Sequence, residues 1–302
     1  MQEDLLAIAA DIVARARRFG ADQADAYVAS STESSVKVRM AKVERILDAG
    51  SNAASIRVIK DQRTAVCSTS DLTPKALDAL VREAVELAKV SEPDEHAGLP
   101  ERADLALGAH PNLQLYDEQI ESISTDEMKD AALRCEQAAF DFDKRVTNSD
   151  GAEMSVVRSQ VALANSLGFA GGYPSTSAML VVEAICDDAD RKKRNAYWFT
   201  TERALHRLET PEEVGRKAAA RAVAQLGARK METKPMPVVW EATVVHQLLQ
   251  ILGQAVSGEL LYRGATFLAD LEGQQVASPL FSLTDEPLLS EPGCGPSVRG
   301  WC

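Results

Sequence analysis

Alternation of apolar and polar residues is clearest in two stretches, Val36-Lys37-Val38-Arg39-Met40 and Ala54-Ser55-Ile56-Arg57-Val58-Ile59. Successive side chains of a strand point to opposite faces of a sheet, so this pattern predicts strands with one face in a core. Three strands are predicted in this region. They cover residues 24–30, 35–48 and 53–68, the last with a turn at Asp61-Gln62.

Two predicted helices flank these strands, because apolar residues recur at helical spacing over residues 3–19 and from Pro74 to about Val90. Thr73 suits the N-cap of the second helix and Pro74 its first turn. The order helix, strands, helix predicts a small α+β domain over residues 1–92, with helices packed on an antiparallel sheet.

The same order recurs after a predicted linker at 93–112, which is rich in Pro, Glu, Asp, His and Gly. The middle domain, 113–230, is predicted to hold a helix over 125–141, strands at 154–166, 176–186 and 196–201, and a helix over 210–226. Ser149-Asp150-Gly151 is predicted to be a turn. The fold class is therefore α+β, with two helix–antiparallel-sheet–helix domains.

A third unit, 234–287, begins with a strand-like run at 236–240. A long amphipathic helix is predicted over 243–262, and a second strand over 275–284. Residues 288–302 form an atypical tail.

The composition limits the classes of partner. The net charge is −12 at pH 7 and the pI is about 4.9, which disfavours binding to nucleic acid or to an anionic membrane. We expect no signal peptide, because no basic region followed by a long apolar run occurs in the first residues, and no membrane span, because no run of 18 apolar residues occurs. The five cysteines contain no CxxC pair, which fits a reducing, cytoplasmic setting.

No self-contained catalytic or metal motif is present. The four histidines are far apart, so neither HExxH nor HExxxH occurs, and GxSxG and GxGxxG are also absent. Asp187-Asp188-Ala189-Asp190 lacks the glycine and glutamate of a calcium loop, so a hairpin turn is predicted there. The basic run at 191–194 is interpreted as one rim of that hairpin.

Several short segments occur in an order and spacing that are specific as a set. They are Phe19–Tyr27, Ser55–Val58, Cys67–Leu72, Gly98–Pro100, Asn148–Ala152, Ala255–Glu259, Tyr262–Gly264, Phe267–Leu268, Gly273–Ser278 and Asp285–Pro287. With these segments, residues 3–287 resemble the TldD/TldE (PmbA) metalloprotease family. The resemblance implies a cytoplasmic heterodimer in which a TldD-type subunit carries HExxxH, in a pattern like HEAVGH, on a C-terminal helix.

Aligned on Gly273–Ser278, that motif falls on residues 253–258, where Gly253 and Gly258 replace the histidines and Gln254 replaces the glutamate. Glycine has no ligand atom, and the glutamine amide is not basic enough to take a proton from zinc-bound water. The chain therefore resembles the TldE type. The resemblance implies no catalytic residue and no metal in this chain, with zinc in a TldD-type partner.

The function implied is that of a non-catalytic subunit of a zinc metalloprotease that cleaves peptides or unfolded proteins, such as modified-peptide antibiotic precursors or labile antitoxins. The chain alone is expected to be inactive, and the C-terminal domain is expected to be a truncated, β-rich one. Two alternatives remain open: a stand-alone peptide-binding or scaffold protein that uses exposed sheet edges, and a non-functional truncated remnant.

Overall fold

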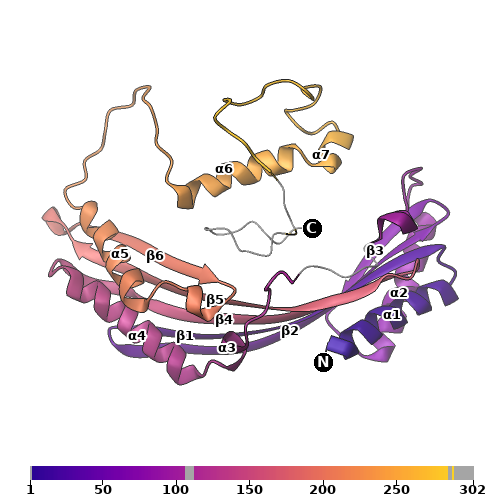
Figure 1. Ribbon diagram of the computed structural model, residues 1–302, viewed down its shortest axis with the longest axis horizontal. Helices are drawn as coiled ribbons and strands as arrows, with labels where there is room; N and C mark the ends of the chain where they lie inside the picture. The colour runs from indigo at the N-terminus through magenta and orange to yellow at the C-terminus, as the bar shows by residue number, and fades with distance from the viewer. Residues whose placement is uncertain (1, 106–111, 285–287, 289–302) are drawn as a thin grey trace. The chain divides into compact units, whose positions relative to one another are not determined.

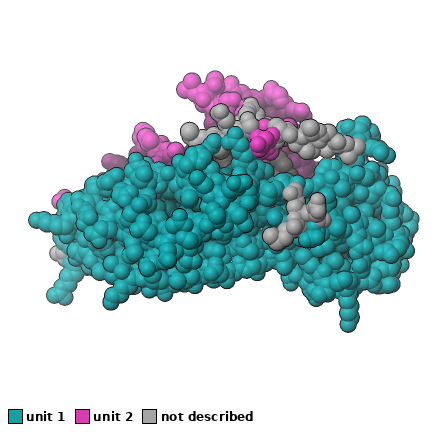
Figure 2. Space-filling view, turned by 60° about the horizontal axis from the view of Figure 1, so that its bottom comes forward, with its two compact units in different colours: residues 1–110, 114–228 teal, residues 111–113, 229–302 magenta. Residues whose placement is uncertain are grey.

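The computed structural model describes residues 2–105, 112–284 and 288. The chain forms two compact units (Figure 2). The first contains residues 1–110 and 114–228, and the second contains residues 111–113 and 229–302.

The first unit is built on one six-stranded antiparallel sheet with the strand order β3-β2-β1-β4-β5-β6 (Figure 1). Its strands are β1 (Gln23–Arg39), β2 (Lys42–Lys60), β3 (Arg63–Thr69), β4 (Val146–Asn165), β5 (Ala170–Asp187) and β6 (Lys193–Glu202).

The central strand β1 joins the two halves of this sheet. Ala26 of β1 lies opposite Ile56 of β2 on one side and opposite Ala164 of β4 on the other. The α+β class with antiparallel strands and packed helices is confirmed. The strands predicted for residues 1–92 and those predicted for 113–230 belong to a single sheet.

Four long helices cover one face of the sheet. They are α1 (Gln2–Arg18), α2 (Pro74–Val90), α4 (Thr125–Phe142) and α5 (Pro211–Ala224), and shorter helices are α3 (Glu118–Ser122), η1 (Arg102–Asp104), η2 (Ala189–Arg191) and η3 (Leu205–Arg207). Side chains set the starts of three of them: Thr73 caps α2, while Ser124 with Glu127 and Thr210 with Glu213 form capping boxes for α4 and α5.

Two hydrophobic clusters lie under these helices, both on the face to which the even-numbered residues of β1 point. Val28 and Ile56 pack with α1 and α2 in the first cluster. Val36, Met154 and Leu180 pack with α4 and α5 in the second. The alternation that predicted the strands thus also selects the face that is buried.

The strand predicted over 35–48 is interrupted by a two-residue hairpin at Met40-Ala41. Both residues have positive φ, 51° and 58°, the geometry of the type I′ turn that usually selects Asn or Gly. The sequence prediction is wrong here because neither residue type signals such a turn.

The turn predicted at Ser149-Asp150-Gly151 is also wrong. These residues lie inside β4, where its register with β5 shifts between Ser149 and Gly151. Gly151 has φ +104°, and a Cβ there would lie 2.5 Å from the carbonyl oxygen of Val38. The residue types of a turn therefore serve a β-bulge, which needs the same backbone freedom.

The second unit is helical where it is regular, with α6 (Ala242–Ala255) and α7 (Gly258–Tyr262). The long helix predicted over 243–262 is broken, because Ser257 caps a new helix and its Oγ accepts from the N–H of Leu260 at 3.3 Å. The strands predicted at 236–240 and 275–284 are absent. The described residues of this unit include no strand with which they could pair. Residues 289–302 of the predicted tail lie outside the described residues.

Candidate functional site

The motif positions singled out in the sequence lie around the junction of α6 and α7. Gly253 and Gln254 are in the last turn of α6, and Gly258 is the first residue of α7. Between them the chain turns at Val256 and Ser257, whose N–H groups donate to Leu252 O at 3.1 Å and Gln254 O at 3.0 Å. The two glycines therefore do not share one continuous helix.

The surroundings of these glycines leave room for larger side chains. A Cβ built on Gly253 or on Gly258 would meet no heavy atom within 4 Å. Neither glycine is thus required by close packing. The donor set does not fit zinc, because two of the three positions have no side-chain ligand and Gln254 offers only a neutral amide. Within the described ranges, no group of three or more His, Cys, Asp or Glu side chains could hold a metal ion.

The nearest histidine in sequence, His246, is engaged locally. Its Nδ1 lies 2.8 Å from the carbonyl oxygen of Thr243 in the first turn of α6. His110 lies outside the described residues. The site predicted from sequence therefore consists of three positions that the structure places on two short helices.

A second candidate is the face of the sheet that the four long helices leave uncovered. It carries large side chains that remain more than a third exposed, namely Tyr27, Leu163, Tyr173, Met179 and Tyr197. Burial raises the pKa of Tyr27, and the neighbouring Tyr173 adds to this effect. This face combines aromatic and aliphatic surface, which is typical of surfaces that contact other polypeptides.

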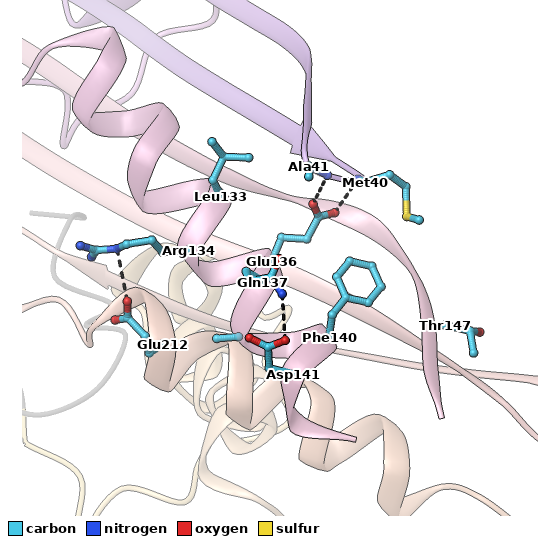
Figure 3. Close-up of a pocket in the computed structure, with 11 residues that line it drawn as sticks. Met40, Ala41, Leu133, Arg134, Glu136, Gln137, Phe140, Asp141, Thr147 and Glu212 are labelled. Atoms are coloured by element: carbon cyan, nitrogen blue, oxygen red, sulfur yellow. Dashed lines mark hydrogen bonds and ion pairs between the residues drawn. The ribbon is translucent and has the colours of Figure 1, made fainter. Parts of the chain in front are cut away.

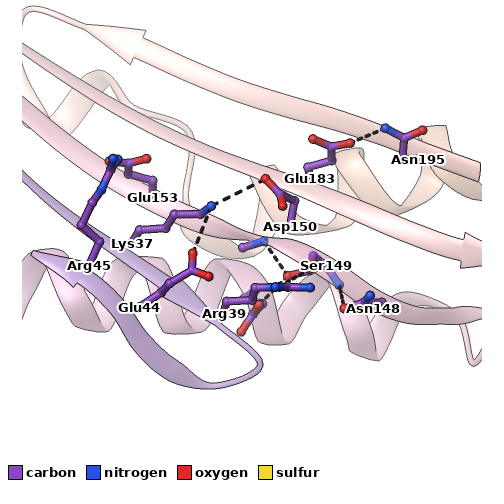
Figure 4. Close-up of polar contacts among 12 residues, drawn as sticks. Lys37, Arg39, Glu44, Arg45, Asn148, Ser149, Asp150, Glu153, Glu183 and Asn195 are labelled. Atoms are coloured by element: carbon purple, nitrogen blue, oxygen red, sulfur yellow. Dashed lines mark hydrogen bonds and ion pairs between the residues drawn. The ribbon is translucent and has the colours of Figure 1, made fainter.

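Charged residues cross the same sheet near the β1–β2 hairpin (Figure 4). Lys37 Nζ lies 3.1 Å from Glu44 Oε2 and 3.6 Å from Asp150 Oδ2, and Arg45 Nη2 lies 2.7 Å from Glu153 Oε1. The hydrogen bond to Glu44 is the largest cause of the raised pKa of Lys37. These pairs tie β1, β2 and β4 together at the surface.

Sequence reasoning missed the buried carboxylate of Glu136. This residue of α4 is only 2% exposed. Its Oε1 accepts from the N–H of Met40 at 2.9 Å, and its Oε2 accepts from the N–H of Ala41 at 2.8 Å (Figure 3). Ser149 Oγ also donates to it. The carboxylate thus holds the hairpin turn, and the residues of the bulge stabilise the carboxylate.

An open pocket of about 810 Å³ lies beside Glu136, between α4 and the hairpin turn. Leu133, Phe140 and Met40 contribute apolar surface, and Arg134 is paired with Glu212 at 3.3 Å. The position of Glu136 was readable in principle, because it falls at helical spacing between the buried residues Ala132 and Ala139. A charged residue on the apolar face of a helix indicates that a hydrogen-bonding partner is buried with it.

The acidic run at 187–190 is a hairpin turn, as predicted. Asp188 Oδ1 accepts from the N–H of Ala189 at 2.8 Å, and its Oδ2 accepts from Arg194 Nε at 2.8 Å. Lys193 pairs with Asp187. The basic residues therefore neutralise the turn locally.

Comparison with known proteins identifies the family. Family models for the PmbA/TldA metallopeptidases match in three successive parts: domain 1 at residues 24–88, the central domain at 118–226 and the C-terminal domain at 233–298. The chain belongs to the PmbA/TldD metallopeptidase family. The metalloprotease PmbA of Escherichia coli O157:H7 is 33% identical over 268 residues, and a PmbA homologue of Haemophilus influenzae is 32% identical over 255 residues.

These PmbA relatives are longer than the chain. The matched region is 89% of this chain and 59% of the E. coli protein, and 84% of this chain and 56% of the H. influenzae protein. The chain thus spans somewhat more than half the length of the curated relatives that it matches.

Solved structures share the fold. A protein of Bacteroides thetaiotaomicron described as a proposed modulator of DNA gyrase has a TM-score of 0.82 at 24% identity, covering 93% of this chain and 64% of that one. TldE from Thermococcus kodakarensis has a TM-score of 0.69 at 20% identity, covering 87% and 58%. Within the part of this PmbA/TldD-family chain that is described, no helix is long and apolar enough to cross a membrane.

Proposed function

We propose that the chain is a TldE/PmbA-type, non-catalytic subunit that acts with a TldD-type zinc metalloprotease in the cytoplasm, in the proteolysis of peptides or unfolded proteins. One observation carries the proposal: the positions aligned with the zinc motif are Gly253, Gln254 and Gly258. Membership of the PmbA/TldD family supplies the context.

The side chains at these positions favour a non-catalytic role for this chain. A catalytic zinc site needs at least three protein ligands and a base that can take a proton from the bound water. No step of peptide hydrolysis can be assigned to Gly253, Gln254 or Gly258. The zinc, the base and the reaction would come from the TldD-type partner.

The sheet unit offers what a partner subunit needs. Its uncovered face presents Tyr27 and Tyr173 in one part of the sheet and Tyr197 nearer to the paired charges of Lys37 and Arg45. Aromatic side chains with a polar rim are enriched in protein interfaces, and charges at the rim of an interface favour the orientation and rate of association more than the affinity.

Co-purification tests the partnership. The tagged chain is expressed with an untagged TldD-type subunit, and the two are expected to elute together and to cleave an unfolded peptide. Failure to associate would contradict the proposal. As a control, the TldD-type subunit is replaced by a variant that lacks both motif histidines, which should associate but not cleave.

Metal analysis tests the assignment of roles separately. The isolated chain is expected to contain far less than one zinc per molecule after purification in zinc-containing buffer. Stoichiometric zinc, or peptidase activity without the partner that a chelator abolishes, would show that this chain carries its own site.

A further inference from the structure

The outer edge of β2 is unpaired over residues 42–53. β2 pairs with β1 along its whole length, but β3 pairs only with Ala54–Lys60. Lys60 and Arg63 close a two-residue hairpin, so even-numbered residues of β2 direct their main-chain N–H and C=O groups toward β3. The same parity directs those groups outward at Ile46, Asp48, Gly50 and Asn52.

The other edges of this sheet are protected. β3 has only seven residues, and its Arg63 forms a bridge with Pro93. In the half of β5 beyond β6, Pro174 lacks an N–H and the N–H of Thr176 donates to the carbonyl oxygen of Leu115 at 2.9 Å. Short length, proline and covering segments are the devices by which proteins block edge-to-edge pairing.

The edge of β6 is covered in part by the segment after α5, where Gln225 Nε2 donates to the carbonyl oxygen of Asn195 at 2.9 Å. The β2 edge differs from all three, because it contains no proline and, beyond the register shift at Val43–Arg45, it runs regularly over residues 46–53.

The side chains along the β2 edge leave its main chain accessible. Residues 42–53 are almost all exposed, and residues 49–53 are Ala, Gly, Ser, Asn and Ala, without a charge that would repel another strand. The charges at Lys42, Glu44, Arg45 and Asp48 sum to zero. A strand added here would therefore meet main-chain partners and little side-chain selection.

We propose that the β2 edge at residues 42–53 binds an extended segment of another polypeptide, which adds to the sheet as a strand. Only an extended chain repeats donors and acceptors at the spacing of about 3.3 Å per residue that the edge presents. Binding would be tolerant of sequence because the contacts are mainly to the main chain. This activity goes beyond the proposed subunit role, since it belongs to this chain and needs no TldD-type partner.

Proline and alanine at residue 50 form a matched test on the full chain. Gly50→Pro removes the outward N–H and leaves the β1·β2 ladder intact, because that N–H points away from β1. Gly50→Ala keeps the N–H, and its Cβ would lie 4.0 Å from the nearest heavy atom, Ser31 O. The probe is a fluorescein-labelled ten-residue peptide of alternating threonine and valine with a lysine at each end, and its binding is measured by fluorescence anisotropy.

We expect Gly50→Pro to weaken binding at least ten-fold and Gly50→Ala to change it less than two-fold. The same peptide with N-methyl groups on every threonine and valine should not bind, because both of its edges then lack N–H donors. This tests main-chain pairing without any protein variant. Amide hydrogen exchange in residues 42–53 should slow when the unmethylated peptide is added.

Equal binding of the methylated peptide, or no protection of residues 42–53, would overturn the proposal. So would concentration-dependent self-association that Gly50→Pro abolishes while the peptide does not compete, because the occupant would then be a second copy of the chain.

Discussion

The sheet unit and the α6–α7 unit differ in what a strand-like sequence becomes. In β1 and β2 the alternating residues lie in a sheet, because each strand has a neighbour along its length and a helix layer over one face. Residues 236–240 and 275–284 have a similar apolar character but form no strand, and Val239 and Leu280 are 98% exposed. A strand pattern specifies a surface to be buried, and it becomes a strand only where a partner strand is present.

Truncation of a core leucine should give the largest difference between the two units. Leu180→Ala, at a position 1% exposed under α4 and α5, is expected to lower the free energy of unfolding by about 2–5 kcal/mol. Leu248→Ala in α6, at a position 38% exposed, should cost less than about 1 kcal/mol. Urea denaturation followed by circular dichroism measures both, and equal costs would contradict the contrast.

Removal of the buried carboxylate of Glu136 is expected to have the second-largest effect on stability. Glu136→Ala leaves the N–H groups of Met40 and Ala41 without their acceptor and is expected to destabilise the sheet unit by about 2–4 kcal/mol. Replacing the turn by Asn-Gly, with Met40→Asn and Ala41→Gly, should recover part of the loss, since these residues adopt positive φ at lower cost.

The measurement for Glu136 is a double-mutant cycle in urea denaturation. Glu136→Gln, of nearly the same volume, serves as the control for packing. Additive costs of the Glu136→Ala and turn substitutions would show that the carboxylate does not support the turn.

Replacing one helical glycine by alanine in each unit should change stability in opposite directions. A Cβ on Gly215 of α5 would lie 2.2 Å from the carbonyl oxygen of Cys135 in α4, so Gly215→Ala should cost about 1–3 kcal/mol through overpacking. Gly253→Ala in α6 meets open space and should stabilise the helix by about 0.5–1 kcal/mol. Hydrogen exchange of the α4, α5 and α6 amides reports each effect locally, and destabilisation by Gly253→Ala would contradict the open surroundings.

The smallest expected effect is a loss of stability in acid. The hydrogen bond from Arg145 is the largest cause that lowers the pKa of Asp143 to about 2. Because the folded-state pKa is below the unfolded value of about 3.9, this contribution is complete above about pH 5 and is lost progressively as the pH falls through 4 toward 2. The urea midpoint of the Asp143→Asn variant should therefore vary less with pH in this window than that of the parent chain. Identical pH profiles would contradict the assignment.

The sequence predicted the elements whose signals are local and failed where the signal depends on distant residues. The cap at Thr73 and the turn at 187–190 follow from residue type alone. The turn at Met40-Ala41 depends on Glu136, which lies 96 residues away in sequence from Met40. No local pattern marks that relation.

The candidate site shows the same division. Gly253, Gln254 and Gly258 were identified by a family resemblance, whereas the end of α6 at Ala255 depends on the cap supplied by Ser257. The unpaired edge of β2 could not be located from sequence, because strand alternation does not indicate where β3 stops pairing. Pairing partners must be known before an edge can be recognised.

The position of β1 at the centre of the sheet has a consequence for the order of folding. Paired residues of the β1·β4 ladder lie 114 positions apart at Val38 and Ala152 and 140 apart at Asp25 and Asn165, so the ladder closes a long loop. During synthesis the β1–β2–β3 part can form early with α1 and α2, but one side of β1 has no partner until β4 has left the ribosome. The nascent chain would expose that side of β1 for several seconds of translation. Binding of a chaperone, or rapid formation of the β4–β5 hairpin, would then determine how much of the nascent chain aggregates.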